Sequence, residues 1–260
     1  MNSARVLAVA NQKGGVGKTT TSINVAASLA LAGRRVLLID LDPQGNATMG
    51  SGIDKRSINP SVYDVLLGSV PLSAARCRTA AQYDLTPANR ELAGAEVELV
   101  NMPNRETRLK DALNEVREQY DFILIDCPPA LNLLTVNGLC AAHSVMIPMQ
   151  CEYYALEGLS DLVQTIKKVR SHLNPALEIE GLLRTMYDPR NMLAQQVSEQ
   201  LQRHFGDKVY RTVIPRNVRL AEAPSHGISV LALDRQSKGA LAYLALAGEM
   251  LSKPTRGIHG

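Results

Sequence analysis

The sequence predicts an α/β protein with a doubly wound, mostly parallel sheet that is flanked by helices. Two observations lead to this prediction. Short runs rich in Val, Ile and Leu lack a polar face, as expected of strands that helices cover on both sides. These runs alternate with segments of helical periodicity, an order that favours parallel strands joined by crossover helices. The expected strands span residues 6–10, 36–40, 122–126, 145–149 and 179–183.

The segments between the expected strands show either helical spacing or frequent Gly and Pro. Residues 240–251 carry a single charge and are expected to form a helix of the core. Residues 50–105 are interrupted by Gly and Pro, so we expect an exposed excursion there and not a separate domain. Two further helices are predicted from apolar residues at helical spacing: Leu109, Leu113, Val116 and Tyr120, and then Leu159, Leu162, Val163, Ile166 and Val169.

Length and composition fit a single globular domain over residues 1–260. Apolar residues make up 45% of the chain and charged residues 20%, which is typical of folded domains. About five residues precede the first expected strand, so we expect no N-terminal helix-turn-helix. The same segment leaves no room for a signal peptide, and no apolar stretch is long enough to span a bilayer. We therefore expect a cytoplasmic protein.

Cysteine spacing, aromatic content and charge indicate which kinds of site and partner to expect. The four cysteines, at positions 77, 127, 140 and 151, include no pair with the spacing of a zinc or iron–sulfur site. Because the chain has no Trp and only two Phe, we expect no nucleic-acid surface built on aromatic stacking. Residues 161–220 carry ten Lys and Arg against six Asp and Glu. This excess is compatible with a polyanionic partner and also with an ordinary solvated surface.

Residues 13–20 predict a phosphate-binding loop. The segment follows the first expected strand and opens a helix, which is the setting such a loop needs. Its glycines allow backbone N–H groups to turn toward phosphate oxygens, and the helix N-terminus adds a favourable dipole. Lys18 is expected to reach the β- and γ-phosphates, Thr19 to ligate Mg²⁺ and Thr20 to bind the α-phosphate. The expected phosphate-binding residues are Gly14, Gly15, Val16, Gly17, Lys18, Thr19 and Thr20.

The loop departs from the strict phosphate-loop spacing at two positions. Gln12 stands where a glycine is usual, and Lys13 is an extra lysine. The form Lys-Gly-Gly-Val-Gly-Lys-Thr resembles the deviant Walker A motif of the ParA/MinD family of P-loop ATPases. The resemblance implies ATP and Mg²⁺ as cofactors and a homodimer that closes over two nucleotides. It further implies that Lys13 of each chain acts on the partner's phosphates and that Gly14 lies where the subunits come closest.

Three aspartates follow two of the expected strands. Asp40 and Asp126 end apolar runs, and Asp42 lies in the turn after the first of them. An acid at a strand end beside a phosphate loop is the Walker B arrangement, so Asp126 is expected to hold Mg²⁺ through a water molecule. By the family resemblance, Asp40 also faces the metal, and Asp42 orients or activates the attacking water. For each aspartate the alternative is that it caps a turn or a helix.

Three later segments are close to the chromosomal ParA (Soj) subgroup, and the resemblance extends over nearly the whole chain. The segments are residues 150–158, 213–220 and 222–227. The resemblance implies that Met186, Pro215 and Asn217 lie near the adenine. It also implies that Arg190 and Arg219 contact DNA phosphates, and Arg216 is open to either role. The alternative is that these are ordinary surface arginines.

The function that the resemblance implies is ATP-dependent DNA segregation. The ATP-bound homodimer would bind double-stranded DNA without sequence preference, on the nucleoid in the cytoplasm. Hydrolysis would be slow for the chain alone and faster with a ParB-like centromere-binding protein, and it would release the DNA. Whether the cargo is a chromosome or a plasmid stays open, as does polymerisation on DNA.

Two other functions are compatible with a loop of this form. A MinD-like membrane ATPase for placing the division site would end in a basic amphipathic helix. Residues 240–251 have one charge and residues 253–260 only two cations, so we expect no membrane partner. An iron–sulfur carrier would need paired cysteines, which the spacing does not offer.

Overall fold

The computed structural model describes residues 4–253, and these residues contain a seven-stranded sheet of order β3-β4-β2-β5-β1-β6-β7. Neighbouring strands run parallel except for β3 and β4, which are antiparallel. The predicted doubly wound, mostly parallel sheet is therefore confirmed, and all five expected strands are present. The strands are β1 Arg5–Val9, β2 Val36–Asp40, β3 Cys77–Arg78, β4 Asp84–Thr86, β5 Phe122–Asp126, β6 Ser144–Gln150 and β7 Glu178–Thr185.

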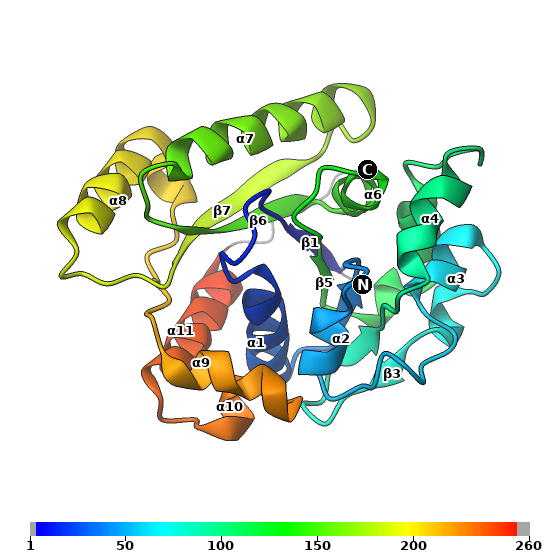
Figure 1. Ribbon diagram of the computed structural model, residues 1–260, viewed down its shortest axis with the longest axis horizontal. Coiled ribbons are helices and arrows are strands. Elements are labelled where there is room, and N and C mark those ends of the chain that lie inside the picture. Colours follow the sequence, from blue (N-terminus) through cyan, green and yellow to red (C-terminus); the bar gives the residue numbers. More distant parts are fainter. Residues whose placement is uncertain (1–3, 254–260) are drawn as a thin grey trace.

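Helices cover both faces of the sheet (Figure 1). Side chains alternate across each strand, so that Leu7 and Leu38 pack toward one face, whereas Val6 and Ile39 pack toward the other. On the face of Leu7, helix α1 (Lys18–Leu31) lies beside α11 (Lys238–Ser252). On the opposite face lie α6 (Leu133–Ala141) and α7 (Ala155–His172). Each face thus has its own apolar core.

The remaining helices complete these two layers. With the face of Val6 pack α3 (Val62–Leu67), α4 (Leu92–Leu99), α5 (Arg108–Leu113) and α8 (Met192–Phe205). With the face of Leu7 pack α2 (Asn46–Gly50), α9 (Val218–Glu222) and α10 (Val230–Leu233). Short 3-10 turns lie at η1 Leu72–Ala74, η2 Arg117–Gln119, η3 Gly206–Lys208 and η4 Ala223–His226.

The prediction that residues 50–105 form an exposed excursion was wrong. This segment adds β3 and β4 to one edge of the sheet. It also buries Leu66, Leu85 and Leu92 completely. Its strands have two and three residues, too short for a periodic pattern to show between the glycines and prolines. Gly52, Gly68 and Pro71 are exposed, but they lie in connections between elements whose apolar side chains are buried in the core.

The predicted helix near residues 109–120 is shorter than its apolar spacing suggested. Helix α5 ends at Leu113, and a 3-10 turn follows before β5 begins at Phe122. Tyr120 is buried, and its hydroxyl donates a hydrogen bond of 2.6 Å to Asp84 Oδ2. The chain has to turn there to enter the sheet, and this requirement overrides the helical pattern.

The predicted core helix at residues 240–251 is present as α11. Tyr243, Leu246 and Met250 are buried, and the helix packs along α1. Leu241, on the outer side of the helix, has 54% of its surface exposed. The prediction that the C-terminal residues form no membrane-binding helix also rests on residues 254–260, which lie outside the described residues. Over residues 4–253, none of the helices combines the length and the apolar character that crossing a membrane requires.

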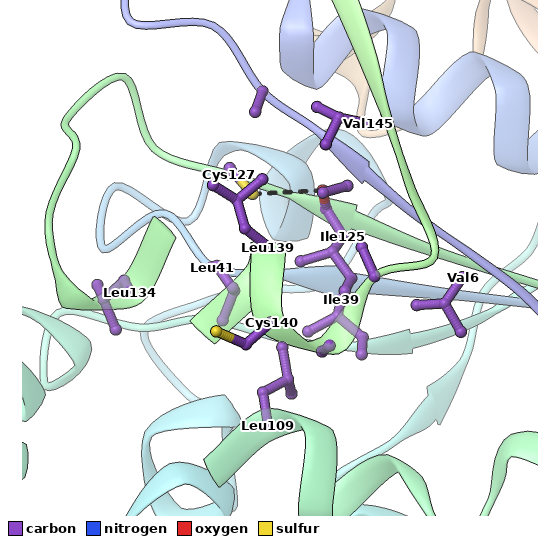
Figure 2. Packing of buried hydrophobic residues seen from close by; sticks show 14 of the residues in the cluster. Val6, Ile39, Leu41, Leu109, Ile125, Cys127, Leu134, Leu139, Cys140 and Val145 are labelled. Carbon is purple, nitrogen blue, oxygen red and sulfur yellow. Dashed lines mark hydrogen bonds between the residues drawn. The ribbon is translucent and has the colours of Figure 1, made fainter. Parts of the chain in front are cut away.

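Helix α6 packs closely against the sheet just behind the ends of β2 and β5 (Figure 2). Cys127, directly after β5, is buried beside Leu139, and its thiol lies 3.8 Å from the carbonyl oxygen of Ile125. A Cβ atom on Gly138 would lie 2.9 Å from Cys127 Sγ and 3.3 Å from Leu41 Cδ1. Glycine at position 138 is therefore what allows α6 to approach the sheet.

We predict that Gly138→Val destabilises the protein. The added side chain has to displace Cys127 or Leu41, and overpacking of this kind costs about 1–3 kcal/mol. Gly248→Ala is the matched control, because Gly248 lies in α11 with no atom within 4 Å of a Cβ there. That variant should gain about 0.5–1 kcal/mol. Urea unfolding measures both, and equal stabilities for the two variants would contradict the packing described.

His143 lies just before β6, at the amino ends of the parallel strands, where it forms hydrogen bonds with β1 and β7. Its N–H donates to the Val6 carbonyl (2.8 Å), its carbonyl accepts from Glu178 N (3.0 Å), and its Nδ1 accepts from Val6 N (3.1 Å). Burial, followed by the positive charges of Arg117 and Lys110, lowers the pKa of His143 to about 4. The folded protein therefore holds this imidazole neutral.

The lowered pKa of His143 predicts a loss of stability in acid. The unfolded chain takes up this proton near pH 6.5 and the folded chain only near pH 4, so stability is full above pH 6.5 and falls between these values. Buried acids with raised pKa values act in the opposite direction, so the comparison needs a variant. His143→Gln should lose less stability than the wild type between pH 7.5 and 5 in urea unfolding. Parallel curves for the two proteins would refute the assignment.

Candidate functional site

The carboxyl ends of the central strands open onto a cavity of about 590 Å³. This is the end of a parallel sheet at which ligands are expected to bind. The phosphate loop, Asp42, Met186 and Pro215 all contribute to its lining. The structure therefore brings together residues that lie more than 200 positions apart in the sequence.

The segment 10–17 links β1 directly to α1, as its sequence predicted. Gly15 and Gly17 have φ angles of 73° and 84°, which side-chain-bearing residues rarely adopt. Together with Gly14 they line the cavity. Val16 differs, because its side chain is buried and its carbonyl accepts a 2.8 Å hydrogen bond from the Thr185 hydroxyl. This contact fixes the loop to the end of β7.

Lys18 lies at the start of α1 and lines the cavity. Only 7% of its surface is exposed, and its ammonium donates to the Lys13 carbonyl at 3.1 Å. Burial lowers the pKa of Lys18, and the carboxylates of Asp126 and Asp42 act against this shift. A bound phosphate group would supply the negative charge that favours the ammonium form further.

Asp126 is completely buried at the end of β5 and is held by helix α1. The Thr19 hydroxyl donates to Asp126 Oδ2 and the Ser22 hydroxyl to Oδ1, each at 2.8 Å. Burial and then the nearby charge of Asp40 raise the pKa of Asp126, while these hydrogen bonds lower it. Sequence reasoning missed Ser22, although it lies three residues after Thr19 on the same face of the helix.

Thr19 and Asp126 fit a magnesium ion. Thr19 lines the cavity and touches the Asp126 carboxylate. Hydroxyl and carboxylate oxygens are hard ligands of the kind that Mg²⁺ prefers, with nucleotide phosphates completing its coordination. Two of the three residues predicted for the metal, Thr19 and Asp126, are therefore in contact with each other.

Asp42 follows β2 and lines the cavity with 9% of its surface exposed. Its Oδ1 accepts a hydrogen bond of 2.9 Å from Gln44 N, which fixes the turn that carries it. Asp40, two residues earlier, is completely buried and is absent from the cavity lining. Its carboxylate accepts hydrogen bonds from Asp42 N, Thr48 N and the Thr48 hydroxyl. That Asp40 also faces the metal stays a prediction from the resemblance.

Met186, Pro215 and Asn217, which the resemblance places near the adenine, all line the cavity. Met186 has a φ angle of 48°, and its sulfur accepts a hydrogen bond of 2.8 Å from Gln150 Nε2. Such strained backbone often lies at ligand sites. Asn217 Oδ1 is a buried acceptor without a hydrogen-bond donor among the described residues. An exocyclic amino group, as adenine has, is the kind of donor that this oxygen lacks.

Several cavity residues were not predicted from the sequence. They come from α2, β7, α9 and α11, from the loops after β2 and β5, and from the segment before α9. No local motif marks them, because they reach the cavity through tertiary packing. They are Gln44, Asn46, Pro129, Thr185, Ile214, Leu220, Ala221 and Tyr243.

Lys13 and Gly14 lie at the outer side of the loop. The Lys13 ammonium forms an ion pair with Glu152, and about half of each side chain is exposed. Lys13 is absent from the cavity lining, whereas Gly14 is part of it. A Cβ atom on Gly14 would meet nothing within 4 Å, and its φ angle is not in the left-handed region. The packing of this chain alone therefore does not require glycine at position 14.

The three arginines considered for DNA binding are exposed, as expected. Arg190 has 89% of its side chain exposed and pairs with Asp188 at 2.8 Å, which lowers the pKa of Asp188 to about 2. Arg219 pairs with Glu222 at 2.8 Å. Arg216 also lines the cavity. A backbone bridge between Tyr187 and Pro215 joins the loops that carry Arg190 and Arg216.

Comparison with known proteins identifies relatives that cover nearly the whole chain. Residues 4–179 match a family model described as an AAA domain. The sporulation initiation inhibitor protein Soj of Bacillus subtilis is 55% identical over 95% of this chain and 98% of its own length. The chromosome partitioning protein ParA of Caulobacter vibrioides is 53% identical over 97% of this chain and 96% of its own length.

A solved structure shows the same fold with a nucleotide and a metal bound. It is that of a Mycobacterium smegmatis protein named cobyrinic acid a,c-diamide synthase, with an ATP analogue and magnesium. It is 44% identical, with a TM-score of 0.85, and the match covers 95% of this chain and 94% of that one.

Proposed function

Because this chain belongs to the ParA/Soj family of chromosome-partitioning ATPases, we propose that the site described above drives a cycle of DNA binding and release. The chain is an ATPase, and its cofactors are ATP and Mg²⁺. One observation carries the proposal. Lys18, Thr19 and Asp42 line one cavity, with Asp126 hydrogen-bonded to Thr19 and the extra lysine, Lys13, on the outer side of the loop.

Each side chain has a role that its position supports. The loop N–H groups and Lys18 hold the phosphates, with Thr19 and Asp126 beside the metal position. When bound, Mg²⁺ neutralises negative charge on the phosphate oxygens. Asp42, which also lines the cavity, orients the attacking water. Phosphoryl transfer depends mainly on positioning and charge, so a strongly basic group is not needed.

In our proposal, two ATP-bound chains close over their nucleotides as a homodimer. Lys13 then leaves Glu152 and contacts the phosphates of the partner, where its charge stabilises the transition state. The half-exposed position of Lys13 supports this role. The open space around Gly14 supports the close approach of a second chain at that point.

The proposed dimer binds double-stranded DNA without sequence preference. Arg190 and Arg219 are exposed cations, and dimer symmetry would double them into a track that contacts phosphates and no bases. Arg216, exposed at the cavity, would sense the nucleotide or join this track. Hydrolysis is slow in the chain alone and is accelerated by a ParB-like partner, after which the dimer separates and releases the nucleoid DNA. In our proposal, residues 1–260 act in this cycle as a single ATPase domain.

Arg219→Glu tests the DNA surface. We expect it to keep ATP binding and dimer formation and to weaken binding to random-sequence DNA by at least about tenfold, with a shallower salt dependence. Fluorescence anisotropy with ATP, with ADP and without nucleotide, at several salt concentrations, measures this effect.

Arg34→Glu is the matched control. Arg34 is exposed just before the amino end of β2, and the cavity lies at the carboxyl ends of the strands. This variant should bind DNA as the wild type does. Equal losses in both variants would mean that net charge alone governs binding. Unchanged affinity in Arg219→Glu would remove that residue from the DNA surface.

A further inference from the structure

The carboxylate of Asp40 is used to hold the turn that carries Asp42. Asp40 Oδ1 accepts from Asp42 N at 3.1 Å, and Oδ2 accepts from Thr48 N at 2.8 Å and from the Thr48 hydroxyl at 2.7 Å. All three donors belong to residues 42–48. Because Asp40 is completely buried, these hydrogen bonds are protected from competition by water.

The neighbouring acid serves a different element. Asp40 and Asp126 are paired in register across β2 and β5, so their side chains leave the sheet at the same level. Yet Asp126 accepts from Thr19 and Ser22, both on α1. The two acids at the strand ends therefore bind different segments. Asp126 holds the helix that follows the phosphate loop, and Asp40 holds the turn after β2.

Thr48 extends the contact to a third segment. Its hydroxyl donates to Asp40 and accepts a hydrogen bond of 2.9 Å from Ala88 N, just after β4. Thr48 is completely buried in α2. The turn from Asp40 to Thr48 is thus fixed at both of its ends, and Asp42 lies between these fixed points with its own Oδ1 bonded to Gln44 N.

We propose that Asp40 and Thr48 are positioning residues for ATP hydrolysis, which fix the backbone of Asp42 at the phosphate end of the cavity. This inference rests on the proposed role of Asp42. Neither residue lines the cavity. A displacement of about 1 Å at a reacting group can cost up to about a hundredfold in rate, so loosening this turn should slow hydrolysis without weakening ATP binding.

Asp40→Asn and Thr48→Val test the proposal. The asparagine amide places an NH₂ group against N–H or O–H donors in either orientation, and valine removes the hydroxyl while keeping the shape of threonine. Both variants should hydrolyse ATP at least about tenfold more slowly, with the ATP dissociation constant and the Mg²⁺ midpoint changed less than about threefold. Thr48→Ser, which keeps the hydroxyl, should restore the rate.

A second readout needs no turnover. Hydrogen exchange at the amides of Asp42, Gln44 and Thr48 in the nucleotide-free protein should accelerate in both variants. Thr79→Val is the matched control, because Thr79 is a buried threonine whose hydroxyl donates to the Tyr83 carbonyl, away from the cavity. It should lose stability and keep the wild-type rate and the wild-type exchange at residues 42–48.

Two outcomes would overturn the inference. One is an Mg²⁺ midpoint raised by Asp40→Asn but not by Thr48→Val, which would place Asp40 at the metal. The other is wild-type hydrolysis and exchange in Thr48→Val. If Asp42→Ala itself leaves hydrolysis unchanged, the proposed function of Asp42 fails, while the exchange measurement still decides whether Asp40 and Thr48 hold the turn.

Discussion

Asp42→Ala should leave ATP and Mg²⁺ binding intact and slow hydrolysis by about a hundredfold or more. Asp42 lines the cavity in a turn that three hydrogen bonds to Asp40 and a fourth from Gln44 N hold in place. Alanine removes the carboxylate that orients water and leaves the phosphate loop unchanged. A dimer that cannot hydrolyse ATP should stay on DNA for as long as ATP is present.

Two measurements check this prediction. Single-turnover hydrolysis gives the rate of the chemical step, and dissociation from random-sequence DNA in ATP gives the lifetime of the complex. Asp54→Ala is the matched control, since Asp54 is an exposed aspartate in the same region whose Oδ1 accepts from Arg56 N. Hydrolysis by Asp42→Ala within about threefold of the wild type would exclude a role for this carboxylate in the chemical step.

Lys18→Ala should abolish nucleotide binding, and with it dimer formation and DNA binding. The Lys18 ammonium is the cation that the fold buries at the phosphate loop, where its contact to the Lys13 carbonyl keeps it over the loop. A ligand at a hundred times its dissociation constant stabilises the folded state by about 2.7 kcal/mol. The wild type should show this increase in stability with ATP and Mg²⁺, and the variant should show none.

The control for this prediction is a lysine outside the cavity. Lys167 is exposed on α7, and Lys167→Ala should keep the full stabilisation by ATP. Denaturant unfolding with and without nucleotide measures all three proteins. If Lys18→Ala retains the stabilisation, the nucleotide binds elsewhere, and the roles of Thr19 and Asp126 lose their basis as well.

The parts of the site that could be predicted from the sequence are those that neighbouring residues encode. The glycines and lysines of residues 13–20 predict the phosphate loop. The apolar strand that precedes Asp126 predicts the role of this acid. Tyr243 is different, since it reaches the cavity only because α11 packs along α1. The contact between Ala88 N and the Thr48 hydroxyl was hidden for the same reason, because it joins residues 40 positions apart in the sequence.

In the fold, too, features encoded by neighbouring residues were predicted, and features that depend on tertiary contacts were missed. Long buried strands such as β2 and β5 were predicted with their bounds, because their side chains are apolar on both faces. The short strands β3 and β4 were missed, since pairing with β2 and not periodicity defines them. The proposals of a partner chain across the nucleotide and of a DNA-binding surface rest on the family resemblance.

The mass of the protein in solution with a non-hydrolysable ATP analogue and Mg²⁺ tests the central claim most directly. Each chain offers a phosphate loop whose outer lysine faces solvent beside a glycine with free space around it. At saturating analogue, light scattering should therefore report twice the mass of one chain, and the mass of one chain without nucleotide. A single-chain mass at saturation would contradict the shared nucleotide site and the DNA-binding surface built on it.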